Sequence, residues 1–171
     1  ISGRALREAI KEQGGRRDGP LRFAVVHPFS GHNYELRYWL AACGINPERD
    51  IEIVYVPPPL MADALANATI DGYCVGEPWN TAAAMASLGR TATVKAALWR
   101  SSPEKVLGVA ADWAEREPEA LRALLRALCR SAQWCADPQN HRELAAVLAS
   151  HAMIDRPADW MLRGLSGVLD T

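Results

Sequence analysis

The sequence predicts an α/β fold, a three-layer lobe with a mostly parallel sheet followed by a helix-rich C-terminal segment. Short apolar runs alternate with helical runs from Leu21 to about Ala97, and the residues after them are rich in Ala, Leu and Arg. Such alternation is typical of a parallel sheet covered on both faces. We expect three parts: the end of a helix and a linker over 1–19, an α/β ligand-binding lobe over 20–98, and a helical segment over 99–171 that returns towards the first lobe.

The first elements are a helix and a turn. Residues 1–13 carry apolar side chains at helical spacing, among them Leu6 and Ile10, and are predicted to be the tail of a helix. Residues 14–20 read Gly-Gly-Arg-Arg-Asp-Gly-Pro, a run of helix breakers that predicts a linker.

Three times between Phe23 and Asn80, a strand pattern breaks into a turn and then a helix. The predicted strand patterns cover 23–28, 51–56 and 73–76, the helices begin near Asn33, Leu60 and Trp79, and a fourth strand follows near 91–97. Each helix start presents unpaired N–H groups and the positive end of the helix dipole, which favour a bound anion. Ligands of open α/β sheets bind at the carboxyl ends of the strands. The chain is therefore expected to bind a small anion or polar ligand.

The remaining elements are predicted to be helices. The helix over 34–43 has Leu36, Tyr38, Trp39, Leu40 and Cys43 as its apolar face, and Gly44 as its stop. The C-terminal helices are predicted over 103–116, 118–136, 139–150 and 157–169. Proline begins three of them, at a position that helices tolerate: Pro118, Pro138 and Pro157.

The composition excludes several function classes. The 171 residues are 49% hydrophobic, enough for one sizeable core, and 19 Lys and Arg balance 20 Asp and Glu to a net charge of -1. This balance argues against direct nucleic-acid binding, and no apolar run is long enough to span a bilayer. The sequence starts at Ile1 with neither an initiator Met nor a signal peptide, so we expect a processed or truncated chain or a single domain.

The four cysteines predict neither a metal site nor a redox motif. Cys43, Cys74, Cys129 and Cys135 form no CxxC pair, and no His lies at metal-ligand spacing. We interpret them as buried or half-buried hydrophobic residues. Free thiols are typical of a reducing compartment.

Two turns supply the first candidate ligand-binding residues. His32 lies where the first helix opens, and its ring could donate a hydrogen bond to an anion; it could equally be a surface or capping His. Gly76 ends the third strand, where a missing side chain lets a ligand approach the backbone. Glu77 could accept a hydrogen bond, pair with a lysine or ligate a hard cation, or simply stabilise a helix start. His27, beside Pro28, is interpreted as structural.

Lys105 is the fourth candidate. Ser102, Pro103 and Glu104 precede it in a pattern typical of a helix start, with Ser102 as N-cap. A lysine in a first turn opposes the helix dipole, and a bound anion would offset that cost. The alternative is a solvated lysine paired with Glu104.

Catalytic patterns are weak. The G-x-S-x-G nucleophile elbow is absent, as are the glycine-rich phosphate and dinucleotide motifs. The sequence therefore predicts a protein that is not an enzyme, with no cofactor and no metal.

The same residues resemble a known family. The matching segments are Leu36–Ala42, Gly44–Pro47, Val56–Pro59, Cys74–Asn80 and Pro103–Gly108. They are similar to the nitrate- and bicarbonate-binding proteins of ABC-type anion uptake systems, and equally to the related soluble nitrate/nitrite sensor that controls an RNA-binding antiterminator. The resemblance implies a type II periplasmic-binding-protein-like fold with the anion between two lobes. Matched motif to motif, His32, the Gly76 backbone and Lys105 fall where the family contacts its anion.

The sequence departs from this family in two ways. The family is roughly twice as long as this chain, so the N-terminal part of its fold, with further ligand contacts, is absent. The turn over 27–33 resembles the sensor branch more than the transporter branch.

The resemblance leaves several functions open. The leading hypothesis is binding of nitrate or nitrite, either by a cytoplasmic sensor that binds the antiterminator or by a periplasmic or membrane-anchored receptor that docks on an ABC permease. The turn and the unpaired cysteines favour the sensor slightly. The alternatives are a bicarbonate receptor that recruits Ca²⁺, a lobe fragment that binds no ligand, and an enzyme of the thiamine-precursor-synthesis type, which would need reactive His or Cys groups. Apolar surface left by the absent lobe could make the fragment a homodimer.

Overall fold

The computed structural model describes residues 3–13, 19–99, 101–102 and 104–167. These fall into two compact units, one extending to Ser102 and the other beginning at Glu104. Among the described residues, no helix combines the length and the apolar character needed to cross a membrane.

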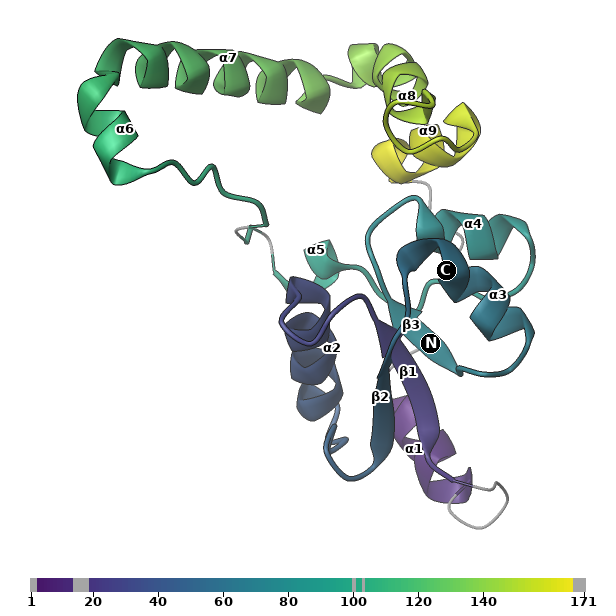
Figure 1. The fold of residues 1–171 in the computed structure, drawn as a ribbon. Helices are drawn as coiled ribbons and strands as arrows, with labels where there is room; N and C mark the ends of the chain where they lie inside the picture. The colour runs from purple at the N-terminus through teal and green to yellow at the C-terminus, as the bar shows by residue number, and fades with distance from the viewer. Residues whose placement is uncertain (1–2, 14–18, 100, 103, 168–171) are drawn as a thin grey trace. The chain divides into compact units, whose positions relative to one another are not determined.

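A parallel sheet organises the first unit (Figure 1). Its strands are β1 (Leu21–Val25), β2 (Ile51–Tyr55) and β3 (Gly72–Cys74), in the order β2-β1-β3. Val25 at the end of β1 lies opposite both Tyr55 and Cys74, so all three strands end at one edge. The predicted parallel sheet is confirmed.

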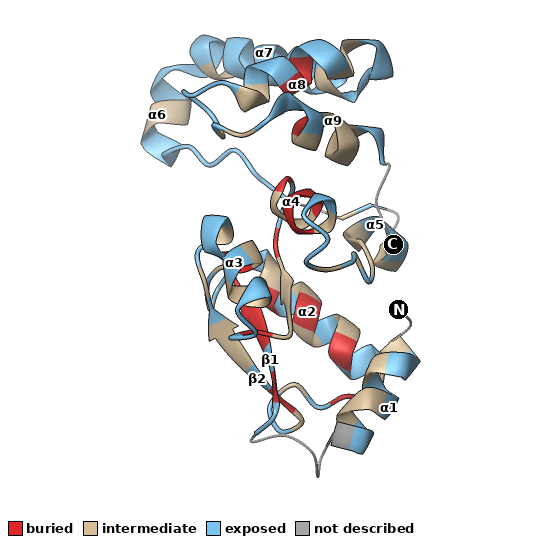
Figure 2. Cartoon of the chain, turned by 90° about the vertical axis from the view of Figure 1, so that its right-hand side faces the viewer, coloured by how far each residue is buried: buried red, intermediate tan, exposed pale blue. Residues whose placement is uncertain are grey.

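Helices cover both faces of the sheet, which makes three layers. One face packs on α2 (Gly31–Ala42) and α1 (Gly3–Gln13), through Leu36 and Leu40 of α2. The other packs on α3 (Met61–Ala66) and α4 (Trp79–Met85), through Met61 and Trp79. A short 3-10 helix, η1 (Pro58–Leu60), leads into α3. Buried residues of this unit lie on β1, on the inner side of α2 and on α4 (Figure 2).

The predicted fourth strand, over 91–97, is wrong. Residues 91–94 have no regular structure, and Lys95–Leu98 form the short helix α5. This segment makes its contacts with α2: Lys95 pairs with Glu35, and the Trp99 ring lies 4.9 Å from the Tyr38 ring between centroids. Tyr38 is thus 54% exposed instead of part of the core.

The second unit is helical among its described residues. It contains α6 (Ala111–Arg116), α7 (Pro118–Ala136), η2 (Pro138–Asn140), α8 (His141–Ala149) and α9 (Ala158–Ser166). The helices predicted over 118–136 and 139–150 are confirmed, and α9 lies within the one predicted over 157–169. Leu144, Ala145 and Met161 are the buried hydrophobic residues of this unit, on α8 and α9.

The helix predicted to begin at Pro103 is wrong over its first half. Pro103 itself lies outside the described residues, and Glu104–Ala110 have no regular structure. Val106, Gly108 and Val109 are poor helix formers, and no buried contact offsets that preference because all of 104–110 are exposed. Ser102 therefore caps no helix.

The cysteine prediction needs one correction. Cys43, Cys74 and Cys135 are half-buried, as expected, but Cys129 is exposed on α7, and none of the four forms a disulfide.

Candidate functional site

The turn between β1 and α2 is fixed by its own hydrogen bonds. Ser30 is the N-cap of α2: its Oγ accepts from the Asn33 N–H at 3.2 Å and donates to the His27 carbonyl at 2.7 Å. The buried Asn33 donates through Nδ2 to the Pro28 carbonyl at 2.6 Å. His27 accepts the Phe29 N–H at 3.2 Å, which agrees with the structural role expected for it. These bonds hold His32 in the first turn of α2.

His32 and Gly76 lie together at the carboxyl edge of the sheet. A Cβ on Gly76 would be 3.7 Å from His32 Nε2, although the two residues come from different strand-to-helix turns. The His32 ring is half-buried, and within the described part of the chain it forms no hydrogen bond or ion pair. The imidazole and the exposed Gly76 backbone are thus available to a small ligand between them.

The turn between β3 and α4 is held by three further bonds. Thr81 donates to Glu77 Oε2 from its backbone N–H at 3.2 Å and from its hydroxyl at 2.8 Å. Asn80 Nδ2 donates to the Val75 carbonyl at 2.8 Å. Glu77 therefore stabilises the first turn of α4, the ordinary role of a carboxylate at a helix start, while its part in ligand binding stays a prediction.

Tyr73 stabilises the same turn from inside the lobe. Its hydroxyl donates to the Trp79 carbonyl at 3.1 Å. Burial, together with the nearby Glu77 carboxylate, raises the pKa of Tyr73 to about 12. The hydroxyl thus stays protonated and keeps donating at physiological pH. Tyr73 was predicted to lie on the third strand but was not among the candidate site residues.

Lys105 lies in the second unit, on the irregular segment described above. Its ammonium is 2.6 Å from Glu104 Oε1, and its side chain is 84% exposed. The helix dipole that was expected to act on Lys105 is absent, because no helix starts there. The pairing with Glu104 agrees with the alternative interpretation of Lys105, and its role as a ligand stays a prediction.

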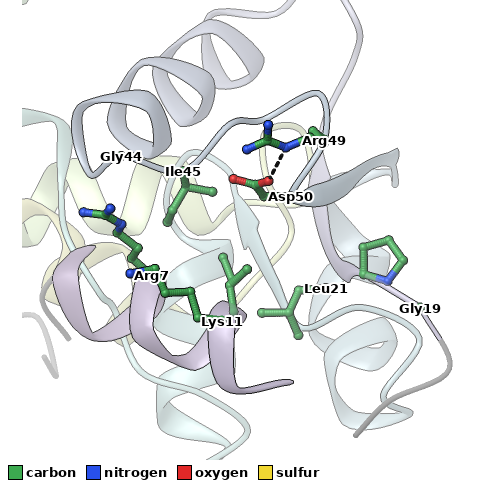
Figure 3. A pocket seen from close by; sticks show the side chains of 10 residues that line it. Arg7, Lys11, Gly19, Leu21, Gly44, Ile45, Arg49 and Asp50 are labelled. Atoms are coloured by element: carbon green, nitrogen blue, oxygen red, sulfur yellow. Dashed lines mark hydrogen bonds and ion pairs between the residues drawn. The ribbon is translucent and has the colours of Figure 1, made fainter. Parts of the chain in front are cut away.

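A pocket of about 600 Å³ lies at the opposite edge of the sheet, where β1 and β2 begin (Figure 3). Arg7 and Lys11 of α1 line it, with Arg49 and Asp50 before β2. The Asn46 backbone N–H, 2.8 Å from Oδ2, and the Arg49 guanidinium, 2.9 Å from Oδ1, hold the pKa of Asp50 below its ordinary value. The pocket is separate from His32 and Gly76, and no sequence pattern predicted it, because residues far apart in sequence form it.

The described residues include no group of three or more His, Cys, Asp or Glu side chains placed to hold a metal ion.

Comparisons with known proteins agree with this architecture. A bicarbonate transport ATP-binding protein, CmpC of Synechococcus elongatus, is 44% identical over 80% of this chain and 21% of its own length. The nitrate/nitrite binding protein NrtA of the same organism is 39% identical over 95% of this chain, which spans 37% of that relative.

Two solved structures have this fold. The periplasmic nitrate-binding protein NrtA from Synechocystis PCC 6803 superposes with a TM-score of 0.82 at 30% identity, over 95% of this chain and 41% of that one. The ligand-binding component of an ABC-type import system from Staphylococcus aureus shares the fold alone, with a TM-score of 0.71 at 19% identity over 92% of this chain and 52% of its own. The sequence also matches the NMT1-like family over residues 1–149. Because that match covers most of the sequence, this chain belongs to the NMT1-like family.

Proposed function

We propose that this chain is the anion-binding part of a substrate-binding protein of an ABC-type uptake system, with nitrate or nitrite as its ligand and no catalytic activity. The observation that carries the proposal is the 3.7 Å between His32 Nε2 and the Cβ position of Gly76, at the carboxyl ends of β1 and β3. A ring N–H, open backbone and the first amides of α2 together provide donors for a small oxyanion. In this proposal Lys105 supplies a positive charge.

The relatives support a transport role. Of the relatives that are similar over most of this chain, one is named a bicarbonate transport ATP-binding protein and another a nitrate/nitrite binding protein, and one of the solved structures is described as periplasmic. We therefore favour a periplasmic or membrane-anchored receptor that docks on a permease over a cytoplasmic sensor that binds an antiterminator. The gene sequence upstream of Ile1 tests this choice, because the transport role requires an export or lipoprotein signal there.

Calorimetric titration of the chain with nitrate and with nitrite tests the ligand. Gly76 has no left-handed φ, and a methyl group there would meet His32 at an ordinary contact distance. We expect Gly76→Ala to fold normally and to lose at least about tenfold in affinity, because the methyl fills the space beside the ring. Gly108→Ala is the control, since nothing lies within 4 Å of its Cβ position.

Removing the donors should also weaken binding. His32→Ala and Lys105→Ala should each cost about 1–3 kcal/mol of nitrate affinity if they remove a charge-assisted hydrogen bond. Unchanged affinity in Gly76→Ala, His32→Ala and Lys105→Ala would contradict the proposed site. No heat with either anion would leave the chain a lobe fragment without a ligand of its own.

Bicarbonate is the second candidate ligand, and the 44% identity to a bicarbonate transport component favours it. Calcium takes hard oxygen ligands, and exposed carboxylates such as Glu77 could supply them. Titration with bicarbonate in the presence of Ca²⁺ and of a chelator separates the two hypotheses. Binding of bicarbonate that requires Ca²⁺, with no binding of nitrate, would replace the first proposal.

A further inference from the structure

We propose that Glu35 and Lys95 form a charge-compensating pair that sets the anion affinity of the site at the start of α2; this inference rests on the proposed function. Lys95 Nζ lies 2.6 Å from Glu35 Oε1. The two side chains are only 29% and 18% exposed, so solvent screens this pair less than the surface pairs of the chain.

Glu35 places a negative charge close to the candidate site. It lies on α2 three residues after His32, and its Oε1 is 3.7 Å from the Cβ position of Gly31, the first residue of the helix. A carboxylate there stabilises the helix start but repels an anion bound to the same amides. A site for anions at this place needs a nearby positive charge.

Lys95 supplies that charge from a distant part of the sequence. It begins α5, and the Trp99 ring, one turn later, packs against the Tyr38 ring, one turn beyond Glu35 on α2. The Lys95–Glu35 ion pair and the Trp99–Tyr38 ring contact therefore follow one another in the same direction along both segments, and together they hold α5 beside α2. The fold fixes the ammonium beside Glu35, whereas a long lysine on an open surface would sample many positions.

If Lys95 compensates the charge of Glu35, removing the charge of either residue should change nitrate affinity in opposite directions. Glu35→Gln removes a negative charge from the start of α2, so the repulsion of the anion falls and nitrate affinity should rise at least about threefold. Lys95→Met leaves the carboxylate uncompensated, and nitrate affinity should fall at least about threefold. The double variant should return to within about twofold of the unaltered chain, and Lys95→Arg should keep its affinity because the charge remains. A purely structural pair would weaken binding in both single variants.

The experiment is a calorimetric nitrate titration of these four variants, with thermal unfolding of each as a check on folding. A matched control is the pair Arg22 and Glu52 on β1 and β2, 3.0 Å apart, whose side chains are 54% and 47% exposed. Arg22→Met and Glu52→Gln should leave nitrate affinity unchanged.

The outcomes separate the two proposals. If the unaltered chain does not bind nitrate, the proposed function fails and this inference fails with it. If it binds, but Glu35→Gln and Lys95→Met leave affinity unchanged or shift it in the same direction, the inference alone is overturned.

Discussion

A single hydroxyl, that of Tyr73, links the core of the first unit to the turn that carries Gly76. Its pKa is raised to about 12, first by burial and then by the Glu77 carboxylate. An unfolded tyrosine titrates near 10. The folded state thus disfavours the phenolate, so this contribution to stability is complete below about pH 10 and is lost as the pH rises through about 12.

Replacing Tyr73 with Phe tests this assignment. We expect Tyr73→Phe to remove the last tyrosine to ionise in an alkaline titration followed by tyrosinate absorbance. It should also lower the free energy of unfolding by about 1 kcal/mol, through loss of the bond to the Trp79 carbonyl. Tyr34→Phe is the control, because Tyr34 is 58% exposed: this variant should keep the latest ionisation and leave the free energy of unfolding unchanged. A latest ionisation that persists in Tyr73→Phe would contradict the assignment.

Sequence patterns identified some site residues more reliably than others. His32 and Gly76 were expected at strand-to-helix turns, and parallel strands bring such turns to one edge, so their proximity follows from topology. Lys105 was expected in the first turn of a helix because of the serine and proline before it, but the β-branched residues and the glycine after it disfavour that helix. No sequence pattern connects Glu35 with Lys95, because 60 positions separate them: Glu35 looks like an ordinary helical surface residue, and Lys95 lies in the segment that was predicted to be a strand.

At the scale of elements, the start of α2 depends on one side chain. Ser30 accepts the Asn33 N–H and donates to the His27 carbonyl, so it joins the helix to the turn before it. Ser30→Ala should lower the free energy of unfolding by about 1 kcal/mol, measured in urea. It should also weaken nitrate binding if the first amides of α2 contact the anion.

Ser30→Asp provides the comparison, since aspartate caps helices about as well as serine. It should keep the cap on the Asn33 N–H but lose the bond to the His27 carbonyl, so it should be more stable than Ser30→Ala, and its negative charge at the helix start should still weaken anion binding. Equal stability of Ser30→Ala and the unaltered chain would show that the cap is not what holds this turn.

The predicted positions of helices and strands match the structure where the local sequence preference and the tertiary packing favour the same conformation. β1, α2 and α7 have strong periodic patterns, and their positions were close to those expected. The segment over 91–97 has only a weak alternating pattern of apolar residues. In the structure it forms a loop and the start of α5, and Lys95 contacts Glu35 of α2. The segment over 104–110 has β-branched residues and a glycine, which disfavour the helix that the serine and proline before it suggested.

At the scale of the whole molecule, burial is distributed unequally between the two units. Of the residues that the structure describes, thirteen hydrophobic ones are buried in the first unit and three in the second. The 19-residue helix α7 has no buried residue, and Leu124, Leu125 and Leu128 are 38%, 44% and 44% exposed. Most helical stability in proteins comes from packing of an apolar face, so α7 in this chain has little to stabilise it.

Hydrogen exchange followed by mass spectrometry should show the unequal burial of the two units as a difference in amide protection. We expect amides of β1 and α2 to exchange only through global unfolding, and amides of α7 to be protected at least about a hundredfold less, because α7 can open without exposing a core. Helix α8 is the internal control: its Leu144 is buried, so its protection should exceed that of α7. Equal protection of α7 and β1 would mean that something covers the exposed leucines in solution. Protection that rises with protein concentration would identify that cover as a second copy of the chain, because only association responds to concentration.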